Sequence, residues 1–236
     1  MTDTTREIFD TAEDLASHVA AELVATVARV QADDLTPQIV LTGGTVADRI
    51  HRAVAASPGD VDWHDVEFWW GDERFVPEDD EDRNAKAARS AMLDHLGVRE
   101  DAVHEMPAAD GREPEAAALL YAEEIRHHPA GRFDVVMLGL GPDGHVASVF
   151  PGHPSFRDTD DAAYAVADSP KPPADRITLS LTALNEAAEV WFVVSGEAKA
   201  DAVQRVLAGD ESLPGAHVRG TKATRWFLDA EAASRL

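Results

Sequence analysis

The sequence has no cysteine, few basic residues and no long apolar run. Without cysteine, the chain forms no disulfide, thiolate metal site, iron–sulfur cluster or cysteine nucleophile. Its 44 Asp and Glu outnumber 21 Lys and Arg, which gives a formal charge of -23. So acidic a protein is repelled by nucleic acids and anionic membranes, and neither is expected as a partner. No apolar run approaches the ~18 residues of a membrane span, and the N-terminus lacks the features of a signal peptide, so we expect a cytoplasmic protein.

Apolar patterning predicts alternating helices and strands. Helical spacing is found at residues 12–30, 46–56, 84–96, 114–126 and 197–207, and strand-like runs at 38–42, 66–70, 133–139, 177–181, 190–195 and 225–228. Strands that are apolar on both faces and alternate with helices predict a doubly wound, mostly parallel α/β sheet with helices on both faces. No linker divides the chain, so residues 1–236 are expected to form one domain. Ligands of such sheets bind beyond the carboxyl ends of the strands.

Two of the loops that follow predicted strands can bind an anion. Gly43 and Gly44, followed by Thr45, would let the backbone approach a phosphate at the start of a helix. An ordinary turn would look the same. After the next strand, Arg74 could bind a phosphate or carboxylate and Asp72 could orient it or bind sugar hydroxyls, although a surface loop with a local salt bridge is the alternative.

The glycine-rich segment after the strand at 133–139 is the most informative. Its Gly139, Gly141 and Gly144 spell G-x-G-x-x-G, but Pro142 removes an amide N–H and further prolines cut off the helix that a dinucleotide site needs. The segment instead presents His145, two residues after Asp143. Histidine titrates near neutrality and can take a proton from water, as a hydrolytic site requires. A loop histidine bonded to a backbone carbonyl is the alternative.

Two further basic residues lie at strand and helix starts. Arg176 opens a predicted strand, and Lys199 lies in the first turn of a predicted helix, where a cation needs a partner or a ligand. Glu197 could be that partner. The histidine spacings predict no metal site, because adjacent His127 and His128 would not share a helical face. No G-x-S-x-G elbow supports a serine nucleophile.

Taken in order, these segments resemble one family. Five blocks are similar to those of the 6-phosphogluconolactonases, within the glucosamine-6-phosphate isomerase/6-phosphogluconolactonase family: Leu41–Thr45, Gly71–Pro77, Leu138–Gly152, Arg176–Thr178 and Gly196–Lys199. The resemblance implies a cofactor-free lactonase that hydrolyses 6-phospho-D-glucono-1,5-lactone to 6-phospho-D-gluconate, the second step of the oxidative pentose phosphate pathway. It also implies the Rossmann-like fold shared with sugar-phosphate deaminases and isomerases.

The resemblance also assigns roles to residues. It implies His145 as the base that activates water, Arg176 near the phosphate or the lactone carbonyl, and Asp143 as a group that orients His145 or contacts sugar hydroxyls. It further implies that the phosphate is bound by the loop Gly43, Gly44 and Thr45 together with Arg74 and Lys199. Asp72 and Gly141 are implied to make further contacts with the substrate. One departure is Val46-Ala47 where the family often has a proline, which affects the shape of the first phosphate loop.

Two other functions stay open at this point. A glucosamine-6-phosphate deaminase has a glutamate five residues after its histidine, where this chain has Phe150, which cannot move a proton. A non-catalytic sugar-phosphate-binding regulator of the same fold is the second alternative. The sequence leaves the oligomeric state open, with a monomer favoured, and the acidity suggests adaptation to a salty cytoplasm.

Overall fold

A parallel sheet of six strands forms the centre of the protein. The computed structural model describes residues 3–236. The strands follow the order β1-β9-β8-β5-β2-β3, and all their pairings are parallel. Their bounds are Asp3–Phe9 for β1, Gln38–Leu41 for β2, Glu67–Trp70 for β3, Val135–Leu138 for β5, Glu189–Val194 for β8 and Ala223–Asp229 for β9. The predicted doubly wound, mostly parallel fold is confirmed.

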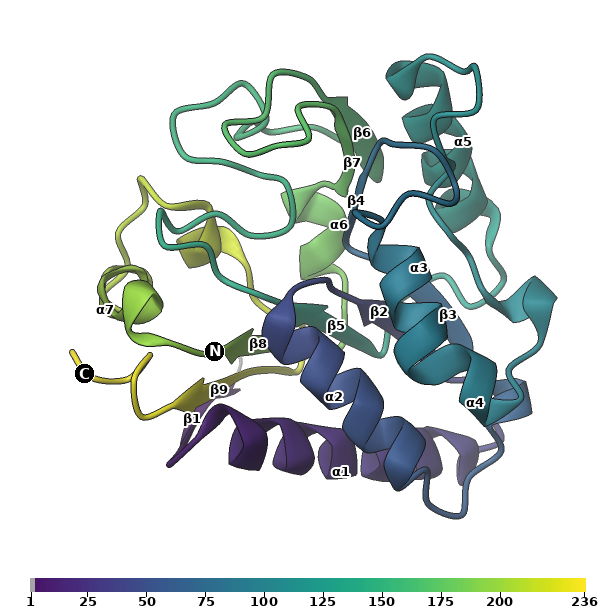
Figure 1. Cartoon of the computed structure of the whole chain (residues 1–236), viewed down its shortest axis with the longest axis horizontal. Helices are drawn as coiled ribbons and strands as arrows, with labels where there is room; N and C mark the ends of the chain where they lie inside the picture. The colour runs from purple at the N-terminus through teal and green to yellow at the C-terminus, as the bar shows by residue number, and fades with distance from the viewer. Residues whose placement is uncertain (1–2) are drawn as a thin grey trace.

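Helices lie on both sides of this sheet. In Figure 1, α1 and α2 lie below the row of strands and α6 lies above it. The helices are α1 (Ala12–Gln31), α2 (Thr45–Ala56), α3 (Asn84–Ala88), α4 (Asp94–Leu96), α5 (Pro114–His127), α6 (Leu181–Asn185) and α7 (Ala200–Leu207). A π-helical turn, Arg89–Leu93, joins α3 to α4, so the helix predicted at 84–96 is present as one helical run with a distortion. Short 3-10 turns occupy Trp63–Asp65, Glu100–Ala102, Glu197–Lys199 and Pro214–His217.

A second, antiparallel sheet was not expected as such. It consists of β4 (Asp72–Arg74), β7 (Arg176–Leu179) and β6 (Ala163–Val166), in that order. Only β7 was predicted as a strand, and its last predicted residues instead begin α6, where the Ser180 hydroxyl accepts a hydrogen bond from Ala183 N at 3.0 Å. Both β4 and β6 are too short for their alternation to show. This sheet matters for function because it carries Asp72, Arg74 and Arg176.

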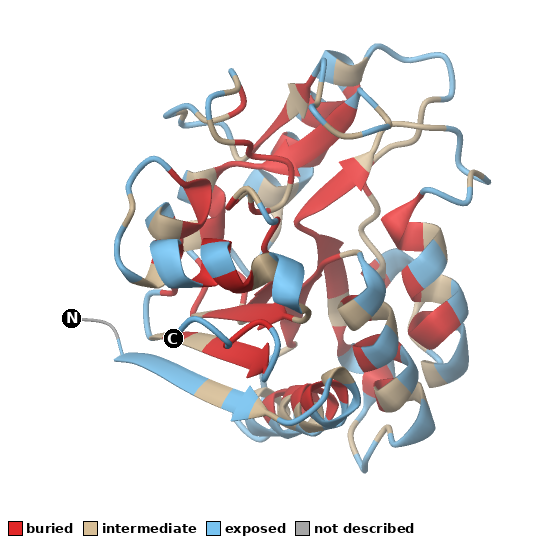
Figure 2. Ribbon diagram, turned by 60° about the vertical axis from the view of Figure 1, so that its left-hand side comes forward, coloured by how far each residue is buried: buried red, intermediate tan, exposed pale blue. Residues whose placement is uncertain are grey.

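The core lies between the sheet and the helices. Figure 2 shows the buried residues concentrated in the strands and on the inward faces of the helices. Most buried apolar side chains, from Leu15 to Ala233, form one contiguous cluster, and Val149, Tyr164 and Val166 form a smaller second one. The strand β1 escaped prediction because it is a mostly exposed edge strand of polar sequence, placed only by its pairing with β9. Across residues 3–236, no helix has both the length and the apolar character needed to cross a membrane.

The strand order creates a switch point between β2 and β5. From β2 the chain proceeds to β3 on one side, whereas β5, β8 and β9 follow one another on the other side. The loops after β2 and β5 therefore diverge and leave a crevice at their carboxyl ends, where ligands of open α/β sheets bind.

Candidate active site

A cavity of about 310 Å³ opens at the carboxyl ends of the central strands. Its walls come from the loops that follow β2, β3, β5 and β8, together with the loop that precedes β7. The lining residues include Thr42, Gly43, Gly44, Asp72, Arg74, Asn84, Gly139, Gly141, His145, Lys171, Arg176 and Lys199. A volume near 300 Å³ is at the lower end for small-molecule sites and suits a compact ligand.

His145 and Asp143 form a close pair at one wall of this cavity. His145 Nδ1 lies 2.5 Å from Asp143 Oδ1, a hydrogen bond that places the proton on Nδ1. The other ring nitrogen, Nε2, then carries a free lone pair and has no hydrogen-bond partner among residues 3–236. Partial burial acts against the charge on Asp143, but the hydrogen bond and the charges of His145 and Lys171 outweigh it and hold the pKa of this carboxyl well below its usual range. Asp143 is therefore an ionised group that fixes the ring and its tautomer.

The glycine-rich turn makes this pair possible. Gly141 N donates to His145 O at 2.9 Å, and Gly144 N donates to Gly141 O at 2.9 Å, so the chain reverses within five residues. Gly144 has φ +84°, a left-handed conformation that favours glycine. A Cβ on Gly141 would lie 1.9 Å from His145 Nδ1 and 2.4 Å from Asp143 Oδ1. The second glycine of the motif thus serves the histidine pair, and not a dinucleotide.

Asn84 connects two of the loops that form the cavity. Its Oδ1 accepts a hydrogen bond from Arg74 Nη1 at 2.5 Å, and its Nδ2 donates to the backbone oxygen of Asp72 at 3.0 Å. The same Oδ1 would lie 1.9 Å from a Cβ on Gly43, so the Gly43 backbone packs directly against the amide. Sequence reasoning missed Asn84, because an asparagine at the start of a predicted helix looks like a capping residue.

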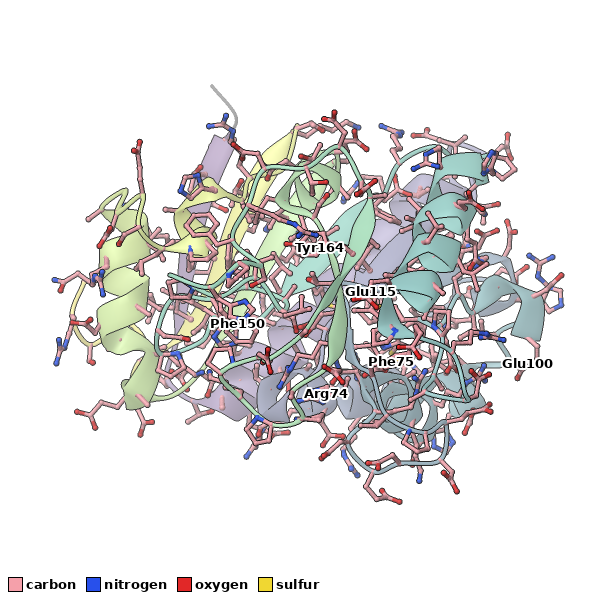
Figure 3. The ribbon with its side chains drawn as sticks, turned by 90° about the horizontal axis from the view of Figure 1, so that it is seen from above. Arg74, Phe75, Glu100, Glu115, Phe150 and Tyr164 are labelled. Carbon is pink, nitrogen blue, oxygen red and sulfur yellow. The ribbon has the colours of Figure 1, made fainter. Side chains whose placement is uncertain are left out.

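The helix start is capped instead by Glu73. This buried carboxylate accepts hydrogen bonds from the backbone N–H groups of Asn84 at 2.7 Å and Ala85 at 2.8 Å, as well as from Arg74 N at 2.8 Å. Burial raises the pKa of Glu73, while the charge of Arg83 and these N–H groups act in the opposite direction. Glu73 therefore positions Arg74 and Asn84 from behind, and points away from the cavity. Arg74, labelled in Figure 3, also donates to Asp82 O at 2.8 Å.

Arg176 holds the loop that precedes β7. Its guanidinium donates to the backbone oxygens of Lys171 at 3.1 Å, Pro172 at 2.9 Å and Pro173 at 3.2 Å. Its remaining nitrogen, Nη1, lies 4.0 Å from Asp72 Oδ2, which itself accepts a hydrogen bond from the hydroxyl of Ser148 at 2.6 Å. Burial lowers the pKa of Arg176, with the charge of Asp72 opposing the shift. Much of the hydrogen-bonding capacity of Arg176 is thus used to shape the cavity wall.

Lys171, which the sequence did not single out, is brought to the site by this loop. Its Nζ lies 3.3 Å from His145 Nδ1 and 3.7 Å from Asp143 Oδ1. Burial also lowers the pKa of Lys199, and the charge of Lys171 adds to the effect while Asp143 opposes it. Four basic side chains, those of Arg74, Lys171, Arg176 and Lys199, therefore line one cavity of a strongly acidic protein.

Most of the residues expected from the sequence converge here. Gly43, Gly44, Asp72, Arg74, Gly141, His145, Arg176 and Lys199 all line the cavity. Asp143 lies behind His145, outside the lining, and Thr45 is exposed as the first residue of α2, next to the lining glycines. Phe150, also labelled in Figure 3, is fully buried with its ring 4.6 Å from that of His145. It forms part of the apolar floor beneath the imidazole.

Known sequences match nearly the whole length of the chain. The family model described as glucosamine-6-phosphate isomerases/6-phosphogluconolactonase matches residues 10–226. A 6-phosphogluconolactonase of Mycobacterium leprae is 41% identical over 98% of this chain and 97% of its own. One of Streptomyces coelicolor is 43% identical over 94% of this chain and 90% of its own.

Solved structures are similar throughout their length. A 6-phosphogluconolactonase of Thermotoga maritima superposes with a TM-score of 0.84 at 26% identity, covering 96% of this chain and 100% of its own. That of Trypanosoma brucei gives a TM-score of 0.82 at 25% identity and covers all of both chains (100% and 100%). A monomeric glucosamine-6-phosphate deaminase shares the fold at 18% identity, with a TM-score of 0.82. The matched region, the identities and the shared fold together show that the chain belongs to the glucosamine-6-phosphate isomerase/6-phosphogluconolactonase family.

Proposed function

We propose that this protein is a 6-phosphogluconolactonase, which hydrolyses 6-phospho-D-glucono-1,5-lactone to 6-phospho-D-gluconate with His145 as the general base. The observation that carries the proposal is the His145–Asp143 pair, with a free Nε2, on a cavity lined by four basic side chains. The names of the relatives in the preceding comparisons support the same substrate.

In the proposed reaction, Nε2 of His145 takes a proton from a water molecule. The hydroxyl oxygen forms a bond to the lactone carbonyl carbon, and the carbonyl oxygen gains negative charge. The ring carbon–oxygen bond then breaks, and the ring oxygen receives the proton from His145, which regenerates the base. Asp143 stabilises the transient imidazolium through Nδ1, at 2.5 Å. A nearby cation or N–H group must stabilise the negative charge that develops on the carbonyl oxygen. Lys171 and Arg176 are basic groups of the cavity that can do so, and Lys171 lies close to His145.

The phosphate is proposed to lie between the first two loops. Gly44 precedes α2 with φ 105°, and the first N–H groups of this helix have no intrahelical acceptor. Together with Thr45, Arg74 and Lys199, the loop offers both hydrogen bonds and positive charge to a dianion. Because burial lowers the pKa of Lys199, an incoming phosphate would favour its charged form.

The deaminase alternative lacks its proton relay. Five residues after His145, the chain has Phe150, which is fully buried and has no titratable group. A non-catalytic binding protein of the same fold would not need a histidine held in one tautomer by a carboxylate. Neither alternative has a specific observation in its favour.

The decisive test is His145→Ala, assayed with freshly prepared 6-phosphogluconolactone at controlled pH after subtraction of spontaneous hydrolysis. We expect a loss of about 10²- to 10⁴-fold in kcat, the usual contribution of a general base, with 6-phosphogluconate binding largely retained. The matched control is His153→Ala, since His153 lies in the same loop but bonds Ser155 at 3.0 Å and does not line the cavity. A loss below about 10-fold in His145→Ala contradicts the assignment, and ammonia release from glucosamine-6-phosphate would support the deaminase.

The composition of the chain also bears on where and with what the enzyme works. We infer that the enzyme acts in the cytoplasm, as a single domain and without a cofactor, and that a monomer is the favoured form. The strongly acidic composition, at a formal charge of -23, supports the expectation that it binds neither nucleic acid nor anionic membranes.

A further inference from the structure

A cluster of titratable side chains lies at the end of β3 remote from the proposed active site. It consists of Glu67, His104 and His128, whose potential ligand atoms all lie within 4.8 Å of one another. Glu67 is the first residue of β3, whereas the cavity lies beyond the last residue of that strand. His104 follows the 3-10 turn Glu100–Ala102, and His128 directly follows α5. Three segments far apart in sequence thus converge at the outer edge of the sheet.

The cluster is centred on one oxygen of Glu67. Its Oε2 lies 3.3 Å from His104 Nε2 and 2.6 Å from His128 Nε2. The three side chains are only 14%, 11% and 17% exposed, in the order Glu67, His104 and His128. Despite these short distances, Glu67 Oε2 and His104 Nε2 are buried without a hydrogen-bond partner in the part of the chain that the structure describes. His104 Nε2 faces Glu67 Oε2 at 3.3 Å without a hydrogen bond between them, which leaves room for a further atom that contacts both.

The other nitrogen of His104 indicates what that atom is. His104 Nδ1 lies 2.6 Å from Glu124 Oε1, so this nitrogen carries the proton in the neutral ring. Nε2 then turns a lone pair towards the carboxylate of Glu67, which is repulsive unless a second ring proton or a metal ion lies between the two. A histidine that donates its second N–H to a carboxylate is the usual arrangement of a metal ligand, since the carboxylate fixes the tautomer and increases the basicity of the ring. The His104 ring is further held by stacking on Trp69 at 3.8 Å.

We propose that Glu67, His104 and His128 bind a divalent transition-metal ion of the Zn²⁺ type, with Glu124 orienting His104. Two imidazoles and one carboxylate favour such an ion over Mg²⁺ or Ca²⁺, which prefer oxygen ligands. In a tetrahedral site with bonds of about 2.1 Å, donor atoms are about 3.4 Å apart, close to the 3.3 Å between His104 Nε2 and Glu67 Oε2. The 2.6 Å contact of His128 must lengthen on binding, and the proton of that ring must move to Nδ1, at the cost of a long 3.3 Å contact from Ala130 N.

Such an ion would have a structural role. It joins the edge strand β3 to the C-terminal end of α5 and to the segment after Glu100–Ala102, and it lies outside the cavity that holds His145. Metal binding to the folded state stabilises it by mass action. The expected consequence is greater stability with unchanged lactone hydrolysis.

The test is calorimetric titration of chelator-treated protein with Zn²⁺, in molar KCl and excess Mg²⁺ to suppress weak binding to the acidic surface. We expect one Zn²⁺ per chain and a rise in Tm. His104→Ala and His128→Ala should each weaken binding by more than about 100-fold, and Glu124→Gln by about 10-fold, the effect of losing an outer-shell partner. The matched control is His127→Ala, because His127 is exposed next to His128 and its Nδ1 contacts the Glu123 backbone oxygen at 2.8 Å. If His128→Ala does not fold, His128→Gln replaces it in the same titration.

A second measurement uses Co²⁺, which quenches indole fluorescence at short range. Because His104 stacks on Trp69, stoichiometric Co²⁺ should quench the wild type and the control but not His104→Ala. The proposal is overturned if the wild type takes up no stoichiometric Zn²⁺ under these conditions. It is equally overturned if binding persists in both His104→Ala and His128→Ala, or if His127→Ala abolishes it as well. Retained lactone hydrolysis in these variants distinguishes this site from the proposed catalytic one.

Discussion

Replacing Gly141 by alanine tests the geometry of the proposed catalytic pair without removing either member. A Cβ at this position would lie 1.9 Å from His145 Nδ1, whereas real Cβ contacts stay above 3.0 Å, so the imidazole must move by at least 1.1 Å (3.0 minus 1.9). The Asp143 carboxylate, at 2.4 Å from the same Cβ, must move as well. Both are the ends of side chains, which can swing away without displacing the backbone.

The expected cost is catalytic. A displacement of about 1 Å in a reacting group costs about 10²-fold, or about 2.7 kcal/mol of transition-state stabilisation. We therefore expect kcat to fall by about 10²-fold or more, while the free energy of unfolding changes by less than about 1 kcal/mol, as for a glycine to alanine change with a compatible backbone. The measurements are the lactonase assay at controlled pH and urea denaturation.

Gly71→Ala is the matched control for this experiment. Gly71 directly follows β3, its nearest atoms lie 3.7 Å from the added Cβ, which is ordinary contact, and it does not line the cavity. We expect near wild-type kcat in this variant. If Gly141→Ala folded and retained kcat within about 5-fold of the wild type, far less than the expected loss, the close His145–Asp143 pair would not be required for catalysis.

Three further predictions concern charge. Lys171→Met removes one of the four cavity cations and should raise KM for the phosphorylated lactone by about 3- to 10-fold at low salt, an effect that shrinks as salt screens it; an unchanged KM would place Lys171 outside the binding site. Burial lowers the pKa of His51 to about 4, below its value of 6.5 in the unfolded chain, so the stability linked to its neutral form is complete above pH 6.5 and is lost as pH falls towards 4. That loss is about 3 kcal/mol. In urea denaturation, the free energy of unfolding of His51→Leu should therefore fall less between pH 7 and pH 4.5 than that of the wild type. Equal pH dependence of the unfolding free energy in wild type and variant would refute this prediction. Added KCl should maintain or raise both Tm and activity by screening repulsion within a protein of charge -23, and a marked loss of both at molar salt would contradict this.

Local pattern alone revealed the framework of this protein. The buried strands β2, β3, β5 and β8 are short, mainly apolar runs, a pattern that predicts strands covered on both faces. The helices between them carry apolar residues at helical spacing. Glycines after those strands identified the loops that meet at the carboxyl edge of the sheet. His145 and Arg74 were found because each lies a few residues after such a strand.

The strands that were not predicted show little pattern in their own sequence. The edge strand β1 is polar and exposed, and β4 and β6 are short, so each forms through pairing with a strand that is distant in sequence. The second sheet determines where Arg176 and, through its backbone contacts, Lys171 lie. No spacing along the chain encodes that placement.

By itself, the sequence determined the class of fold, the position of the main loops and the acidic character of the surface, because these depend on composition and on neighbours along the chain. Only the tertiary structure decided which side chains share a space. Asn84 bridges two loops, four basic groups gather in one cavity, and Glu67 meets His104 and His128 across three segments. The histidine spacings do not predict this cluster, since spacing along the chain reports only residues on one helix or turn. Convergence of distant segments depends on strand order and packing, which a linear pattern does not contain.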